Sequence, residues 1–201
     1  MKVILVRHGQ TEWNFLKKYQ GQTDIPLMDI GRTQAQRAGE YLANNEAIEA
    51  LYCSDLSRTK ETAEIVGKAV SLIPICDPRL REIAFGEWEG LTFTQVYEKY
   101  QEEFNDWYNN TFKTKVPGGE TFNQVIDRSM EAVKEILAKH KGTVAIVTHV
   151  GVIKAILSQS EVKSDLWQNT VEPGSITTLE FLDASGKKFI PVEIGFDPNN
   201  S

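Results

Sequence analysis

Short apolar strands alternate with amphipathic helices along this chain of 201 residues, and that alternation restricts the fold more than any other feature. Apolar runs at 3–6, 50–53 and 143–148 have the length of buried strands. Stretches with helical periodicity separate them. The pattern predicts an α/β fold with three layers, a mostly parallel central sheet and helices on both faces. Such sheets place their functional sites beyond the carboxyl ends of the strands.

The same periodicity predicts the remaining elements. Helices are expected where apolar residues recur every three to four positions, at 31–44, 57–70, 121–140 and 151–158. Further strands are expected at 175–182, at 189–194 and at 72–76, where Pro74 and Pro78 favour a sheet edge. The aromatic and charged segment 91–110 is expected to form one or two helices. We therefore expect a single domain over residues 1–201, with a helical lid or lobe at about 88–115.

Charge and hydrophobicity argue against two classes of partner. The formal net charge is −6 and no basic stripe offsets it, which argues against binding to nucleic acid. No apolar stretch reaches the roughly 18–20 residues that span a bilayer, and the first apolar run is too short for a signal peptide. We expect a cytoplasmic protein that binds neither nucleic acid nor membrane. A small anionic ligand is not excluded, because a few clustered arginines reverse the local field.

The two cysteines and three histidines do not form a metal-binding pattern. Cys53 and Cys76 lie 23 positions apart inside apolar runs, and we expect both to be buried, reduced thiols. No histidine has a cysteine or histidine partner at ligand spacing, so no metal site is predicted. His140, at the polar end of a predicted helix, is expected to be exposed.

Two of the predicted strands end in a histidine. Arg7 and His8 follow the first strand, and His149 follows the strand at 143–148. If these strands are neighbours in the sheet, the two imidazoles face one crevice. Arg58, in the first turn of a later helix, is either a solvated surface residue or a fork for an anion.

The loop at 78–90 contains two arginines and three glutamates between turn-forming residues. One of its carboxyl groups is a candidate acid or base, and spacing alone does not say which.

Six ordered motifs carry a family resemblance. They read RHGQTEWN, GQTDIPL, SDLSRTKETAEIV, LREIAFGEWEGLT, PGGET and VTHVGVIKAIL. In that order they resemble the histidine phosphatase superfamily, in its phosphoglycerate mutase-like branch, over residues 2–182. A lone Arg-His-Gly would be a weak signal, whereas ordered motifs at matching intervals are a strong one.

The resemblance implies a role for each matching residue. It makes His8 the nucleophile that becomes a transient phosphohistidine, and Glu82 the general acid. It implies that the phosphoryl oxygens are bound by Arg7, Arg58 and His149. Weaker matches imply further substrate contacts at Asn14, Gln20, Gly21 and Val150. Family members often have glycine where this chain has Val150, which leaves the local shape open.

These roles carry physical expectations. A phosphoryl group in transfer spreads negative charge over its oxygens, so guanidinium and imidazole groups can stabilise it without a metal or other cofactor. His8 must be neutral, and we expect its other ring nitrogen to bond a backbone carbonyl. Glu82 must hold a proton for the leaving group, so we expect burial to raise its pKa.

The substrate is the least determined feature. The PGGET motif begins only 35 residues after Glu82, and so short a lid favours hydrolysis over the mutase reaction. Chain length and the aromatic segment are similar to alpha-ribazole-5'-phosphate phosphatases, which act in cobalamin nucleotide-loop assembly. We therefore expect alpha-ribazole 5'-phosphate first. The alternatives are a broad-specificity phosphatase for 3-phosphoglycerate or phosphoserine, a phosphoglycerate mutase, and a non-catalytic phosphate-binding regulatory module. The expected partner is a small phosphomonoester, and a homodimer is left open.

Overall fold

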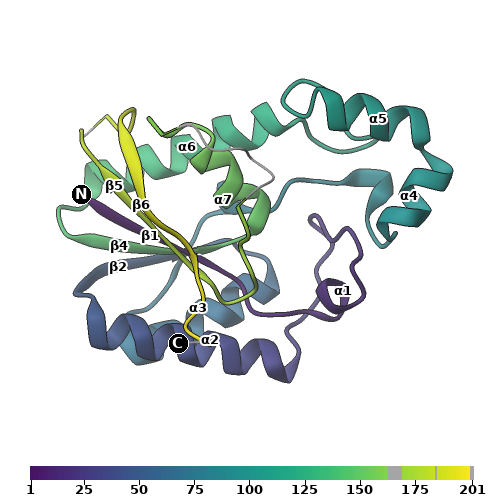
Figure 1. Ribbon diagram of the computed structural model, residues 1–201. Helices are drawn as coiled ribbons and strands as arrows, with labels where there is room; N and C mark the ends of the chain where they lie inside the picture. The colour runs from purple at the N-terminus through teal and green to yellow at the C-terminus, as the bar shows by residue number, and fades with distance from the viewer. Residues whose placement is uncertain (163–168, 184, 200–201) are drawn as a thin grey trace.

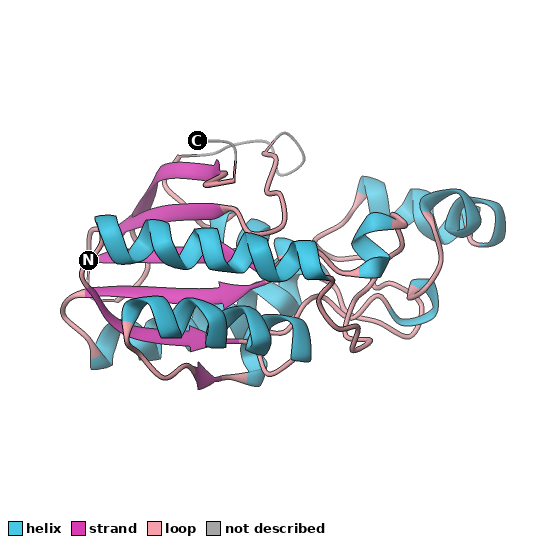
Figure 2. Cartoon of the chain, turned by 90° about the horizontal axis from the view of Figure 1, so that it is seen from below, coloured by secondary structure: helices cyan, strands magenta, loops and turns pink. Residues whose placement is uncertain are grey.

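A six-stranded sheet forms the middle layer, with the strand order β3-β2-β4-β1-β5-β6 (Figures 1 and 2). This computed structural model describes residues 1–162, 169–183 and 185–199. Its strands are β1 Lys2–Arg7, β2 Ile48–Cys53, β3 Ile75–Cys76, β4 Thr143–Thr148, β5 Ile176–Phe181 and β6 Phe189–Phe196. The first four are parallel, and β5 runs antiparallel to both β1 and β6. The predicted α/β fold with a mostly parallel sheet is confirmed.

Helices cover both faces of this sheet (Figures 1 and 2). The α-helices are α1 Glu12–Phe15, α2 Asp29–Asn45, α3 Ser57–Val70, α4 Phe93–Lys99, α5 Gln101–Asn109, α6 Phe122–Lys139 and α7 Val150–Leu157. Two short 3-10 helices, η1 Pro78–Leu80 and η2 Gly86–Trp88, lie between β3 and α4. The pair α2 and α3 covers one face, and the pair α6 and α7 covers the other.

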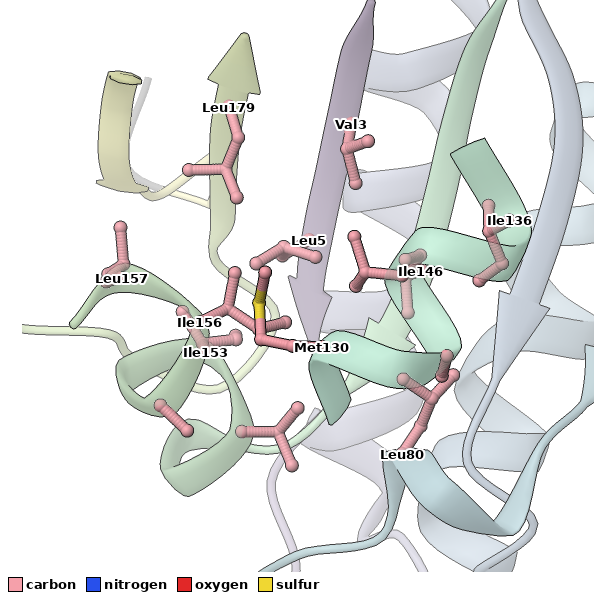
Figure 3. Close-up of a cluster of buried hydrophobic side chains, with 14 of the residues drawn as sticks. Val3, Leu5, Leu80, Met130, Ile136, Ile146, Ile153, Ile156, Leu157 and Leu179 are labelled. Atoms are coloured by element: carbon pink, nitrogen blue, oxygen red, sulfur yellow. The ribbon is translucent and has the colours of Figure 1, made fainter. Parts of the chain in front are cut away.

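The two faces of the sheet pack against separate apolar cores. On the α6 and α7 face, Met130, Ile153 and Ile156 pack beneath β1 (Figure 3). On the opposite face, Leu42 of α2 and Val66 of α3 are buried against the sheet. Because the side chains in the middle of a central strand meet one of these two cores, β1 and β4 have continuous apolar runs, at 3–6 and 144–147, rather than an alternating pattern.

The N-terminus of α6 is fixed by a capping box. Thr121 accepts a hydrogen bond from the backbone N–H of Gln124, whose side chain accepts from the N–H of Thr121. The apolar stripe of α6 follows directly, and it buries nine residues of this helix. The helix predicted at 121–140 is confirmed to within one residue at each end.

The helices α4 and α5 lie beyond the carboxyl ends of the parallel strands (Figure 1). They pack on an aromatic cluster of their own, in which Trp88, Phe104 and Trp107 are buried. Edge-to-face contacts hold it together, such as that between Trp88 and Trp107 with ring centroids 5.5 Å apart. The cluster is separate from the two sheet cores, so it fixes α4 and α5 over one end of the sheet.

Three expectations need correction. β3 is shorter than predicted and contains only Ile75 and Cys76, although it does lie at the sheet edge. Cys76 is exposed rather than buried, because an edge strand has a neighbour on one side only. His140 is half-buried rather than exposed, since it bonds Tyr52 Oη and Glu49. Within the described ranges, none of the helices has both the length and the apolarity needed to cross a bilayer.

Candidate active site

The carboxyl ends of β1 and β4 bring His8 and His149 together. Arg7 and Thr148 are register partners in these parallel strands, and the backbone N–H of His8 donates to the carbonyl of Thr148 at 3.0 Å. The two imidazole centroids are 5.1 Å apart with their planes at 63°, and both rings are buried. The structure therefore brings the two histidines together at the ends of neighbouring strands.

His8 is oriented by its own loop. Its Nδ1 lies 2.7 Å from the carbonyl oxygen of Gly9, and because a carbonyl only accepts, Nδ1 carries the proton. The neutral ring then has its lone pair on Nε2. Burial lowers the pKa of His8 well below its ordinary value, and the positive charges of Arg58 and Arg7 lower it further. The expected carbonyl bond is confirmed, and the lowered pKa favours the expected neutral ring.

Arg58 is fully buried in the first turn of α3. Its two terminal nitrogens donate to the carbonyls of Thr23 at 3.0 Å and Gly21 at 2.6 Å. A guanidinium can only donate, so the Gln20 amide turns its oxygen toward it and accepts from Nε at 2.6 Å. Burial lowers the pKa of Arg58 to about 10. Neutral oxygens orient this cation without neutralising it, which favours an anion beside it.

Several buried polar atoms next to these groups have no protein partner. Both ring nitrogens of His149 and the Nε of Arg7 form no hydrogen bond with the part of the chain that is described. The NH1 group of Arg7 donates to the carbonyl of Val171 at 2.6 Å. Leaving buried donors and acceptors unpaired is costly in a folded protein. The arrangement suits a ligand rich in oxygen atoms.

Glu82 completes this group, which is called the charged cluster: Arg7, His8, Arg58, Glu82 and His149. Its carboxylate accepts from the N–H of Ile83 at 2.9 Å and from the N–H of Gly151 at 3.3 Å. Burial nevertheless raises the pKa of Glu82, because desolvation outweighs these bonds and the nearby arginines. The raised pKa expected from the sequence is confirmed.

Gly151 has to be glycine for this contact. A β-carbon at position 151 would lie 2.2 Å from Glu82 Oε1, well inside van der Waals contact. The absence of that carbon lets the first turn of α7 approach the carboxyl group closely enough to donate its backbone N–H.

Arg128 on α6 supports the Glu82 loop, and sequence reasoning missed it. Its guanidinium donates to the carbonyl oxygens of Arg79 at 2.8 Å, Arg81 at 2.5 Å and Glu82 at 3.0 Å. It also pairs with Glu120 at 2.9 Å. Nothing in the sequence distinguishes Arg128 from a solvated residue on the polar side of α6.

Glu89 is the second group that sequence reasoning left without a role. Its carboxylate accepts from the backbone N–H groups of Gln22, Thr23 and Phe85, each at 3.0 Å. It therefore ties the loop that orients Arg58 to the loop that carries Glu82. The sequence did single out the three glutamates of the loop 78–90. Their spacing could not show that Glu89 joins two loops while another glutamate is the candidate acid.

The weaker candidates lie around the charged cluster in different ways. Gln20 and Gly21 contact Arg58, as described above. Asn14 forms a capping box with Thr11 at the start of α1, and it lines a polar cavity of about 320 Å³ together with Arg7. The side chain of Val150 faces elsewhere, into an apolar pocket on the Glu82 side.

This second cavity, the aromatic pocket, has a volume of about 320 Å³. Glu82 and Gly151 lie at its wall, so it adjoins the charged cluster on the Glu82 side. Seven aromatic residues line it: Tyr19, Phe85, Phe93, Phe104, Trp107, Tyr108 and Phe122. Val150 thus adds apolar surface to the pocket at the position where family members often carry glycine.

Arg7, Arg58 and His149 lie around His8, an arrangement that would suit a tetrahedral anion. The sequence model of the histidine phosphatase superfamily (branch 1) matches residues 3–189, so the chain belongs to this superfamily. Among the described residues, no three histidine, cysteine, aspartate or glutamate side chains gather as metal ligands.

Individual relatives differ in how closely they match. A metal-independent phosphoserine phosphatase of Arabidopsis thaliana is 39% identical over 158 residues, 77% of this chain and 66% of that relative. Thus the match spans slightly less than two thirds of that relative. The solved structure of Bacillus stearothermophilus YhfR has a TM-score of 0.86 and 34% identity, over 97% of this chain and 96% of that one. The alpha-ribazole phosphatase of Shigella flexneri has a TM-score of 0.83 with 24% identity, over 97% of this chain and 96% of that one. At that identity it shows a shared fold alone, so the expected special likeness to alpha-ribazole phosphatases is not supported.

Proposed function

We propose that this protein is a metal-independent phosphoric monoester hydrolase that works through a phosphohistidine intermediate. The observation that carries the proposal is the set of unpaired buried nitrogens on His149 and Arg7 beside His8, whose Nδ1 is bonded to a carbonyl. This arrangement supplies donors for phosphoryl oxygens and a lone pair on His8 Nε2 in one place.

The proposed reaction has two steps. In the first, His8 Nε2 attacks phosphorus, the ester P–O bond breaks, and Glu82 gives its proton to the leaving oxygen. In the second, Glu82 takes a proton from a water molecule, whose oxygen attacks the phosphorus and releases His8. Arg7, Arg58 and His149 stabilise the charge on the phosphoryl oxygens in both steps. The neutral His8 and the protonated Glu82 are the forms that the lowered and raised pKa values favour.

A broad range of small phosphomonoesters is the proposed substrate class. The resemblance to phosphoserine phosphatases supports small phosphorylated metabolites such as phosphoserine and 3-phosphoglycerate. The aromatic pocket lies beside Glu82, where the leaving group must be, and its walls favour leaving groups with an apolar face. We therefore expect aryl phosphates to be turned over at least as well as phosphoserine.

Alpha-ribazole 5'-phosphate is a second candidate substrate, and the aromatic pocket is the observation in its favour. A benzimidazole base could stack on rings such as Phe93 or Tyr108. Phe93 of α4 and Tyr108 of α5 both contact the ring of Phe104, so packing within the helices explains them without any ligand. The broad-specificity assignment is therefore the primary proposal.

A substrate panel tests these assignments. We would measure kcat/KM for 1-naphthyl phosphate, phosphoserine, 3-phosphoglycerate and alpha-ribazole 5'-phosphate, with and without a chelator of divalent ions. The proposal expects turnover of several substrates and no loss with chelator. A single well-fitted pocket can discriminate between substrates by roughly 100-fold. A preference of that size or more for alpha-ribazole 5'-phosphate would replace the broad-specificity proposal with the second candidate.

Two further alternatives predict different products. A phosphoglycerate mutase would transfer the phosphoryl group between the hydroxyl groups of 3-phosphoglycerate and release little phosphate. A phosphate-binding regulatory module would bind phosphate and turn over none of the panel. A binding module has no need of a nucleophile and a proton donor together, so the presence of both His8 and Glu82 in the charged cluster supports an enzyme.

A further inference from the structure

The two cysteines meet at the carboxyl ends of β2 and β3. Cys53 and Cys76 are register partners in these parallel strands. Their Sγ atoms lie 3.5 Å apart, and a disulfide brings such atoms to about 2.0 Å. Neighbouring strands are about 4.8 Å apart, a separation within the Cα range of ordinary disulfides. A closing movement of about 1.5 Å between the sulfurs is therefore enough to join them.

The two thiols differ in their access to solvent. Cys53 is fully buried on the α3 face of the sheet, and burial raises the pKa of its thiol. Cys76 is exposed on the edge strand. A dissolved oxidant therefore reaches Cys76 first, while Cys53 lies behind it at bonding distance.

We propose that Cys53 and Cys76 form a reversible disulfide site that closes when a peroxide oxidises the protein. The thiolate of Cys76 attacks the O–O bond of hydrogen peroxide, which forms a sulfenic acid and releases hydroxide that becomes water. The sulfur of Cys53 then attacks the Cys76 sulfur. The S–S bond forms, the S–O bond breaks, and the oxygen leaves as a second water with the proton of Cys53.

The disulfide would close a loop that contains the whole of α3, and with it Arg58. The two chain segments it joins already hold one another in place. The backbone N–H of Asp77 donates to the carbonyl of Cys53 at 2.8 Å, and Arg81 pairs with Asp55 at 2.5 Å. The bond therefore fixes the existing arrangement, so we expect an unchanged kcat and a rise in Tm of roughly 6–12 °C.

Titration of the reduced protein with hydrogen peroxide tests the proposal. We expect the loss of two free thiols, a fall in intact mass equal to two hydrogen atoms, and recovery of both thiols with dithiothreitol. Cys76→Ser, a mild change on an exposed edge, should retain one thiol and show no rise in Tm. In Cys53→Ala, the sulfenic acid on Cys76 should persist and react with dimedone.

Three outcomes would overturn the proposal. In the first, both thiols remain free at peroxide levels that oxidise an exposed cysteine. In the second, Cys76 becomes a sulfinic acid while the Cys53 thiol stays intact. In the third, Cys76 forms a disulfide-linked dimer. Should Cys53→Ala fail to fold, the thiol count and mass of the parent and of Cys76→Ser still decide the matter. These readouts do not depend on the proposed phosphatase activity.

Discussion

The charged cluster and the aromatic pocket adjoin each other, yet they are held by different forces. The cluster is fixed by short hydrogen bonds to backbone groups, such as those that Arg58 donates to the loop carbonyls of Thr23 and Gly21. The pocket is fixed by ring contacts among α4, α5 and nearby loops. Directional bonds set positions to tenths of an ångström, whereas apolar packing tolerates substitutions of similar volume. Substitutions in the charged cluster should therefore impair catalysis strongly, whereas substitutions in the aromatic pocket should mainly change substrate preference.

Replacing the proposed nucleophile should have the largest effect. His8→Ala is expected to lower kcat by more than roughly 10⁴-fold, the scale on which removal of a covalent nucleophile acts. It should also abolish acid-labile phosphorylation of the protein, which a rapid acid quench with a ³²P-labelled substrate measures. His140→Ala is the matched control. His140 lies just before β4, at the opposite end of this strand from His149, and its ring bonds Tyr52 Oη. Undiminished turnover by His8→Ala would show that His8 is not the nucleophile and that the proposed mechanism in the charged cluster is wrong.

Glu82→Gln should cost roughly 10²–10⁴-fold in kcat on alkyl phosphates, the usual range for a general acid. The loss should be smaller on p-nitrophenyl phosphate, because its leaving group needs little protonation. Comparison of the two substrates measures the acid role directly. Glu98→Gln, an exposed carboxyl group on α4, is the control. Equal losses on both substrates would indicate that Glu82 has a structural rather than a proton-donating role.

Gly151→Ala should reduce kcat by roughly 10–100-fold, since even small misplacement of a catalytic group is costly. The reason is the 2.2 Å approach of the new β-carbon to Glu82 Oε1. A double variant with Glu82→Gln should show little loss beyond that of Glu82→Gln alone if the effect passes through this carboxyl group. Full additivity of the two losses would contradict that coupling.

The raised pKa of Glu82 should appear in the pH dependence of stability. A carboxyl group whose pKa is higher in the folded state binds more protons there, so stability falls as pH rises above its unfolded value near 4.5. Glu82→Gln removes this loss. We expect its Tm to exceed that of the parent by a few degrees at neutral pH and to match it below pH 4, as measured by calorimetry. A difference that is the same at every pH would refute this assignment.

The aromatic pocket should give the smallest effect. Phe93 is 54% exposed and lines the pocket, so Phe93→Ala should raise KM for 1-naphthyl phosphate by roughly 2–10-fold. Phosphoserine, which has no ring to contact, should be little affected. Phe15→Ala is the control, because Phe15 is 66% exposed and does not line the pocket. An equal rise in KM for both substrates would show that the aromatic pocket does not recognise the leaving group.

The same contrast explains how much the sequence could predict. The histidines could be placed because they follow buried strands, and parallel strands end at one edge of a sheet. The periodicity of α3 and α6 located both helices to within one residue. Arg128 and Glu89 could not be found, because their roles consist of bonds to backbone carbonyls and N–H groups that lie far away in the chain.

The exposure of Cys76 and the orientation of Val150 were equally hidden from sequence. The apolar run favoured burial of Cys76 even though Pro74 and Pro78 favoured a sheet edge, and the structure shows that the edge position leaves this side chain exposed. Val150 occupies a position that the family resemblance describes as glycine, and only the packing of α7 shows which cavity its side chain meets.

The pairing of β1 with β4 also has a consequence for folding. It joins positions about 140 residues apart in the chain, and contacts of such long range form late because the intervening segment must first be ordered. Recovery of catalytic turnover during refolding should therefore lag behind recovery of helical signal. Enzymatic activity would then report the last stage of assembly, and a growing chain would remain inactive until β4 has been synthesised.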